Sequence, residues 1–135
     1  MSEFTWQVRV YYEDSDAGGV VYYANYLAFM ERARSEWLRT LGFDNHTLKS
    51  QRNVLFAVRR ASLDYFRPAL LDDVLDVSLK LIKRGRASLQ FEQQVRRGET
   101  LLCQGEILLA CVDATTFKAT AIPADILGKV QSLNH

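Results

Sequence analysis

The sequence predicts an α+β domain in which one long amphipathic helix packs on an antiparallel sheet of five or six strands. Three observations support this class. Apolar residues recur at three- and four-residue steps in one long segment. Elsewhere, apolar and polar residues alternate over segments bounded by short turns. With 135 residues, the chain is predicted to form a single domain, residues 1–135, that buries roughly two-thirds of its unfolded surface.

A strand and the long helix open the chain, with an acidic, glycine-containing turn between them. Residues 6–12 alternate between apolar and polar side chains and predict the strand. From about Val21 the apolar spacing becomes helical and predicts a helix of roughly 20 residues, about 30 Å long. Gly42 is expected to end this helix, because glycine readily adopts the left-handed conformation that follows a C-cap.

The rest of the chain predicts strands and two short helices. The helices are expected near residues 45–50 and over residues 124–130, the second opened by Pro123. Short turns join the last three strands, which are therefore expected to form an antiparallel meander. The end of the last strand is apolar on both faces, which predicts a second covered surface and hence a subunit interface. The predicted strands cover residues 54–66, 74–82, 87–96 and 101–112.

Composition excludes several classes of protein. The net charge of +1 gives no electrostatic reason to expect nucleic-acid binding across the whole surface. The longest apolar run, residues 107–112, is far shorter than the ~20 residues of a transmembrane helix. The N-terminus lacks the basic and apolar regions of a secretory signal. Cys103 and Cys111 lie on one predicted strand and cannot bridge each other along it, which favours a cytoplasmic protein with buried, reduced thiols.

The chemistry is expected at the acidic turn, where two aspartates and a glycine pair precede the helix. A carboxylate near a helix N-terminus is stabilised in its charged form and can act as a nucleophile or as a general base. The alternative is that Asp16 only caps the helix or the turn. Gly18 and Gly19 favour a ligand site, because they let backbone N–H groups approach a ligand. No metal is expected, since Gly18 stands at the third ligand position of the calcium-loop pattern and Asn25 at its twelfth.

The turn and the first half of the helix carry a family signature. The matching residues are Tyr12-x-Asp14-Ser15-Asp16-x-x-Gly19-Val20-Val21-Tyr22-Tyr23-x-x-Tyr26, with Phe29, Glu31, Ala33 and Arg34 beyond. On these residues the chain resembles the 4-hydroxybenzoyl-CoA thioesterase family, which has the hotdog fold, a long helix wrapped by an antiparallel sheet. Its branch associated with the bacterial Tol-Pal cluster is similar at Leu63-Asp64-Tyr65-x-x-Pro68-Ala69-x-x-Asp72-Asp73 and at Cys111-Val112-Asp113 before Pro123.

The resemblance implies hydrolysis of an acyl-CoA thioester. It places the catalytic carboxylate on Asp16 and the oxyanion donor on the backbone N–H of Tyr23. Whether Asp16 attacks the carbonyl or activates water stays open at this point. Many members of the Tol-Pal branch carry His where this chain has Tyr23, so the resemblance does not fix the acyl preference. No cofactor is implied, because CoA is part of the substrate.

Further residues are predicted to bind the substrate. Lys83, Arg84 and Arg86 cluster on one predicted turn, which is either a solvated turn or, as in some family members, a docking site for CoA phosphates. His46 and His135 fall outside the signature and are predicted to be surface residues. The predicted binding residues are Gly19, Val20, Tyr26, Arg59, Lys83, Arg84, Arg86 and Ser88.

The resemblance also implies an assembly. Hotdog subunits pair so that their sheets join edge to edge, with active sites at the subunit boundary, and a homotetramer built as a dimer of dimers is expected. Acyl carrier protein is a second candidate partner. The alternative function is a non-catalytic acyl-CoA or acyl-carrier-protein binding module on the same fold, which has no need of an ionised Asp16. A structural role in envelope maintenance rests only on the Tol-Pal association.

Overall fold

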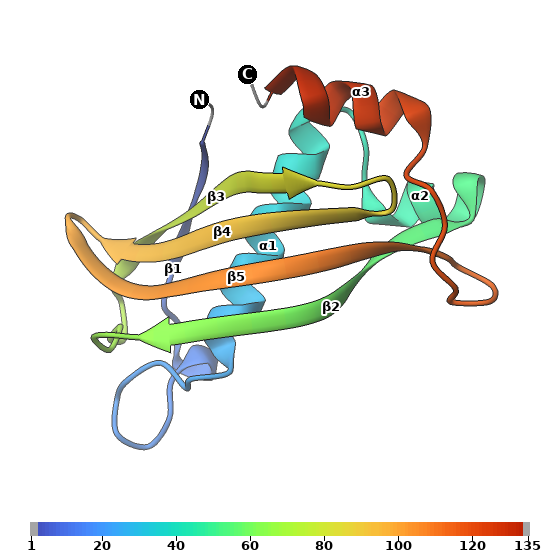
Figure 1. Cartoon of the computed structure of the whole chain (residues 1–135). Coiled ribbons are helices and arrows are strands. Elements are labelled where there is room, and N and C mark those ends of the chain that lie inside the picture. The colour runs from blue at the N-terminus through green and yellow to red at the C-terminus, as the bar shows by residue number, and fades with distance from the viewer. Residues whose placement is uncertain (1–2, 134–135) are drawn as a thin grey trace.

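The computed structural model describes residues 3–133, so the predicted surface residue His135 lies outside it. One antiparallel sheet has the strand order β1-β3-β4-β5-β2, and α1 lies across one of its faces (Figure 1). This confirms the α+β class and sets the number of strands at five. The strands are β1 (Phe4–Arg9), β2 (Val54–Tyr65), β3 (Val74–Arg84), β4 (Ser88–Arg97) and β5 (Thr100–Asp113). The helices are α1 (Asn25–Thr40), α2 (Asn45–Arg52) and α3 (Ala124–Leu133), and Tyr12–Asp14 form a short 3₁₀ helix.

The long helix α1 begins later than its apolar pattern predicts, because the residues just before Asn25 form a turn. It ends where expected. Gly42 has φ +93°, and its N–H donates to the Arg39 carbonyl at 3.0 Å while the Phe43 N–H donates to the Leu38 carbonyl at 3.2 Å. This pair of bonds is the Schellman motif that satisfies the last helical carbonyls. The apolar face of α1 is buried at Tyr26, Phe29, Met30, Ala33, Trp37 and Leu38.

The core lies between α1 and the inner face of the sheet. Phe91 at the centre of β4 is fully buried, and its ring meets that of Trp37 edge-on at 5.2 Å between centroids. Cys103 and Cys111 are buried and unpaired, as predicted. Burial raises the pKa of Cys103 to about 12, which keeps this thiol protonated at neutral pH.

Several details differ from the sequence-based expectation. β1 covers Phe4–Arg9 instead of residues 6–12, because the chain turns into the 3₁₀ helix at Tyr12. β2 covers nearly the whole predicted segment, but its register shifts between Val58 and Arg60, so that Arg59 occupies a bulge. β3 runs through Arg84 and therefore includes two of the basic residues expected in the turn. Of the apolar residues expected to form a second covered surface, Val112 is buried within the chain and forms a β-bridge with Ala119. None of the helices between residues 3 and 133 combines the length and apolar content that crossing a membrane requires.

Candidate active site

The acidic turn folds into a tight loop that projects from the end of the sheet where β2 finishes (Figure 1). Ser15 and Val21 form a β-bridge, and the Asp16 N–H donates to the Val20 carbonyl at 2.9 Å. The Gly19 N–H closes the turn on the Asp16 carbonyl at 3.1 Å. Gly19 has φ +80°, a conformation that favours glycine. The loop therefore brings Asp16 back beside the segment that leads into α1.

The two aspartates of the loop have different surroundings. Asp14 is only 5% exposed, and both of its carboxylate oxygens accept hydrogen bonds, from the Tyr11 N–H at 2.9 Å and from Asn25 Nδ2 at 2.8 Å. Asp16 is exposed, and its Oδ1 accepts one bond, from the Gly18 N–H at 2.8 Å. Its second carboxylate oxygen accepts no hydrogen bond from residues 3–133 and is available to a substrate or a water molecule.

The backbone of Tyr23 presents an unused donor at the start of α1. The preceding N–H is engaged, because Tyr22 donates to the Asp14 carbonyl at 2.9 Å, and the first helical N–H, of Asn25, donates to the Tyr22 carbonyl at 2.8 Å. The Tyr23 N–H itself donates to no acceptor in the described part of the chain. Its carbonyl accepts a hydrogen bond from Tyr65 Oη at 3.0 Å. An N–H with this freedom can bind the oxygen of an incoming carbonyl.

The segment that follows β2 holds the loop in place. Val21 donates to the Ala69 carbonyl at 2.9 Å, and Val20 forms a β-bridge with Leu70. The Ala69 N–H donates to Tyr26 Oη at 3.0 Å. Tyr26 is 3% exposed, and burial raises the pKa of its phenol, so it remains protonated. It is a core residue whose hydroxyl anchors the loop, and it also borders an open groove of about 280 Å³ beside Tyr23 and Tyr65.

The predicted binding residues separate into two groups. Gly19, Val20 and Tyr26 lie with Asp16 and Tyr23 at one end of the sheet. The basic residues lie at the other end, because β3 starts beside the loop-anchoring segment and runs 11 residues, about 30 Å, before it reaches the turn. Within one chain, this predicted basic cluster is therefore remote from the loop, while Arg67 lines the groove beside Tyr23. The distant group consists of Lys83, Arg84, Arg86 and Ser88, with Arg59 in the bulge of β2.

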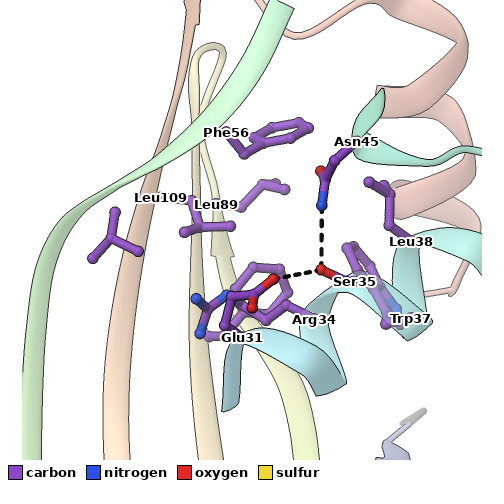
Figure 2. A pocket seen from close by; sticks show the side chains of 11 residues that line it. Glu31, Arg34, Ser35, Trp37, Leu38, Asn45, Phe56, Leu89 and Leu109 are labelled. Atoms are coloured by element: carbon purple, nitrogen blue, oxygen red, sulfur yellow. Dashed lines mark hydrogen bonds between the residues drawn. The ribbon is translucent and has the colours of Figure 1, made fainter. Parts of the chain in front are cut away.

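A second cavity, of about 110 Å³, lies between the C-terminal half of α1 and the inner face of the sheet (Figure 2). The buried Arg34 side chain lines it and donates to Gln93 Oε1 at 2.9 Å. Glu31 accepts from Ser35 Oγ at 2.8 Å, and Asn45 Nδ2 donates to the same Oγ at 3.2 Å. Arg34 follows the helix start by nine residues, about 13 Å along the axis, so this cavity is separate from the Asp16 loop.

Sequence reasoning named Asp14, Asn25 and Tyr65 but assigned none of them a role in shaping the loop. Asp14 and Asn25 lie 11 positions apart in one segment, so a hydrogen bond between this acid and this amide could have been considered from the sequence. Tyr65 has no such local signal, because its partner lies 42 positions earlier. Within residues 3–133, no group of His, Cys, Asp and Glu is arranged to hold a metal ion.

Comparison with known proteins identifies the family. The model of the thioesterase-like superfamily matches residues 10–130. The chain is 46% identical to the acyl-CoA thioester hydrolase YbgC of Escherichia coli O6:H1, over 93% of this chain and 94% of that protein. It is 44% identical to the acyl-CoA thioesterase YbgC of Haemophilus influenzae, over 91% of this chain and 90% of that protein.

Solved structures agree with this assignment. A probable thioesterase from Bartonella henselae superposes with a TM-score of 0.86 at 34% identity, over 90% of this chain and 100% of that one. A 1,4-dihydroxy-2-naphthoyl-CoA thioesterase from Synechocystis shares the fold, with a TM-score of 0.90 at 24% identity over 99% of each chain. The predicted kinship and the hotdog fold are confirmed, and the chain belongs to the thioesterase-like superfamily.

Proposed function

We propose that this protein hydrolyses acyl-CoA thioesters to a free acid and CoA. The observation that carries the proposal is the loop, which presents the exposed Asp16 carboxylate and the unused Tyr23 N–H on one short, firmly anchored segment. The names of the YbgC relatives, which are 46% and 44% identical to this chain, support the same reaction.

The loop supplies the two elements that the reaction needs. The Tyr23 N–H would bind the thioester oxygen, where negative charge develops when a nucleophile adds to the carbonyl carbon. Loss of such a donor costs about 10²–10³ in kcat. Asp16 would either attack that carbon, giving an anhydride that water then cleaves, or remove a proton from an attacking water molecule. In both routes the C–S bond breaks and CoA leaves as a thiolate, which needs no strong general acid.

We further propose that the basic residues at the far end of the sheet bind the phosphates of a CoA held by a partner copy. β2 is an edge strand of 12 residues with Val58 exposed on it, a surface suited to pairing with another strand. Two-fold pairing of two such edges is antiparallel and would bring the start of one β2 to the end of the other. The partner's turn, with Lys83, Arg84 and Arg86, would then approach Asp16.

A homotetramer built from two such dimers, in the cytoplasm, is the proposed form. Arg59 and Ser88 are proposed as secondary contacts to CoA. Thioesters of acyl carrier protein are alternative substrates for the same loop.

A thiol-release assay with a panel of acyl-CoA esters tests the activity. Asp16→Asn is expected to lower kcat by about 10²–10⁴, because it removes the nucleophile or base, while CoA binding and folding remain. Glu99→Gln, in the exposed β4–β5 turn, is the matched control and should keep full activity. Full turnover by Asp16→Asn would overturn the catalytic assignment. Binding of acyl-CoA by the wild-type protein without thiol release would instead favour the binding module.

Mixed subunits test the shared site. The triple variant Lys83→Ala, Arg84→Ala, Arg86→Ala is expected to raise KM strongly and to leave kcat nearly intact. When this variant is refolded together with Asp16→Asn, mixed dimers contain one complete site, so activity with a low KM should reappear. A mixture no more active than the sum of its two components, or an unchanged KM for the triple variant at low salt, would contradict the arrangement.

A further inference from the structure

Tyr65, the last residue of β2, connects the edge of the sheet to the start of α1. Its hydroxyl donates to the Tyr23 carbonyl at 3.0 Å, and its side chain is 47% exposed. Tyr23, which accepts this hydrogen bond, lies 42 positions before Tyr65 in the sequence. The hydrogen bond is therefore a tertiary link between two elements that meet only in the folded protein.

The Tyr23 carbonyl has no partner in the helix itself. The Leu27 N–H donates to the Ala24 carbonyl at 3.2 Å, and the Asn25 N–H donates to the Tyr22 carbonyl. The carbonyl of Tyr23 therefore lies outside the helical hydrogen-bond series, and Tyr65 Oη is its donor among residues 3–133. Because only two backbone torsions separate the carbonyl of Tyr23 from its own N–H, fixing the first restricts the direction of the second.

The Tyr65 ring is itself held by other aromatic rings. It meets the buried Tyr26 ring at 5.3 Å between centroids and the Tyr23 ring at 6.4 Å, both edge-on. The Tyr26 hydroxyl is in turn fixed by the Ala69 N–H. Desolvation, the largest cause, raises the pKa of Tyr65, so the hydroxyl keeps the proton that it donates. The donor is thus positioned before any substrate arrives.

We propose that Tyr65 is a positioning residue that restrains the backbone torsions of Tyr23, so that the Tyr23 N–H points at the oxygen of the reacting carbonyl. The inference rests on the proposed function and adds a residue from β2 to the oxyanion site. Tyr65 does not contact the substrate oxygen in this role. Its effect is transmitted through one hydrogen bond to the residue whose N–H does.

Tyr65→Phe is the direct test, because it removes one oxygen atom and keeps the ring contacts. We expect kcat to fall about tenfold, which is less than the 10²–10³ for loss of a direct oxyanion donor. KM and the melting temperature should change little. Tyr12→Phe is the matched control, because Tyr12 is 82% exposed and its hydroxyl bonds to no residue within 3–133.

The outcomes separate this inference from its alternatives. An unchanged kcat for Tyr65→Phe, with Asp16→Asn inactive, would overturn the positioning role and leave the proposed reaction standing. A raised KM with unchanged kcat would mean that Tyr65 binds substrate instead. The amide NMR signal of Tyr23 gives a readout independent of activity. It should shift in Tyr65→Phe and stay in place in Tyr12→Phe, and an unshifted signal would count against the proposal.

Discussion

Asp14 and Asp16 are the same residue two positions apart, yet they have opposite environments. Asp14 ends a 3₁₀ turn and is directed into the protein, where both oxygens are hydrogen-bonded. Ser15 then becomes extended, with φ −106° and ψ 159°, and the chain carries Asp16 out to the exposed side of the loop. Backbone direction thus determines which carboxylate is buried and hydrogen-bonded within the loop and which is exposed to solvent.

Stability measurements should separate the two aspartates most strongly. Asp14→Ala removes the buried carboxylate that accepts from the Asn25 amide and the Tyr11 N–H, and a hydrogen bond to a charged group contributes about 1.5–3 kcal/mol. We expect the free energy of unfolding to fall by at least that amount. Asp16→Ala, at an exposed position, should change it by no more than about 0.5 kcal/mol. Equal losses in chemical denaturation would show that the two side chains do not differ in this way.

Gly19→Ala should produce a smaller loss of stability, and for a reason confined to the backbone. A Cβ at this position would meet nothing within 4 Å, but the residue has φ +80°. The left-handed conformation costs a residue with a Cβ about 1–2 kcal/mol. Thermal unfolding of Gly19→Ala should therefore occur at a lower temperature. Gly98→Ala is the control for the same backbone effect outside the loop, because Gly98, in the β4–β5 turn, also has a positive φ, of +59°. An unchanged melting temperature would indicate that the loop rearranges freely.

Gly18→Ala should have the smallest effect on stability and should lower kcat instead. Its φ is not in the left-handed region, and a Cβ there would lie 3.2 Å from Asp16 Oδ1. The carboxylate would have to move by a few tenths of an ångström. We expect kcat to fall several-fold while the melting temperature stays the same. If Gly18→Ala lost more stability than Gly19→Ala, Gly18 and not Gly19 would be the glycine that the loop conformation requires.

Most of the fold could be predicted because its elements have clear periodicity. The helical spacing found α1, and its boundary was wrong only where Tyr22, Tyr23 and Ala24 form a turn while continuing an apolar pattern. Alternation found every strand of the sheet. The alternating pattern gave no role to Gln93, which is fully buried in β4. Its side-chain amide accepts a hydrogen bond from Arg34 and donates one to the Met30 carbonyl.

The site could be predicted only in part. The signature proposes Asp16 and Tyr23 as site residues, because both lie in one contiguous segment, and this assignment stays a prediction. It could not assign separate roles to the two aspartates, since the partners of Asp14 are known only once the loop has folded. It also could not show that the basic cluster lies at the far end of the sheet from Asp16, which depends on strand order and register.

The burial of both cysteines has a consequence for a protein whose proposed product is itself a thiol. Disulfide exchange requires a thiolate that a disulfide can reach. With a pKa of about 12, Cys103 would be ionised in only ~1 molecule in 10⁵ at pH 7. Burial likewise raises the pKa of Cys111. Repeated release of CoA would thus leave the protein free of mixed disulfides with its own product, even when oxidised CoA accumulates.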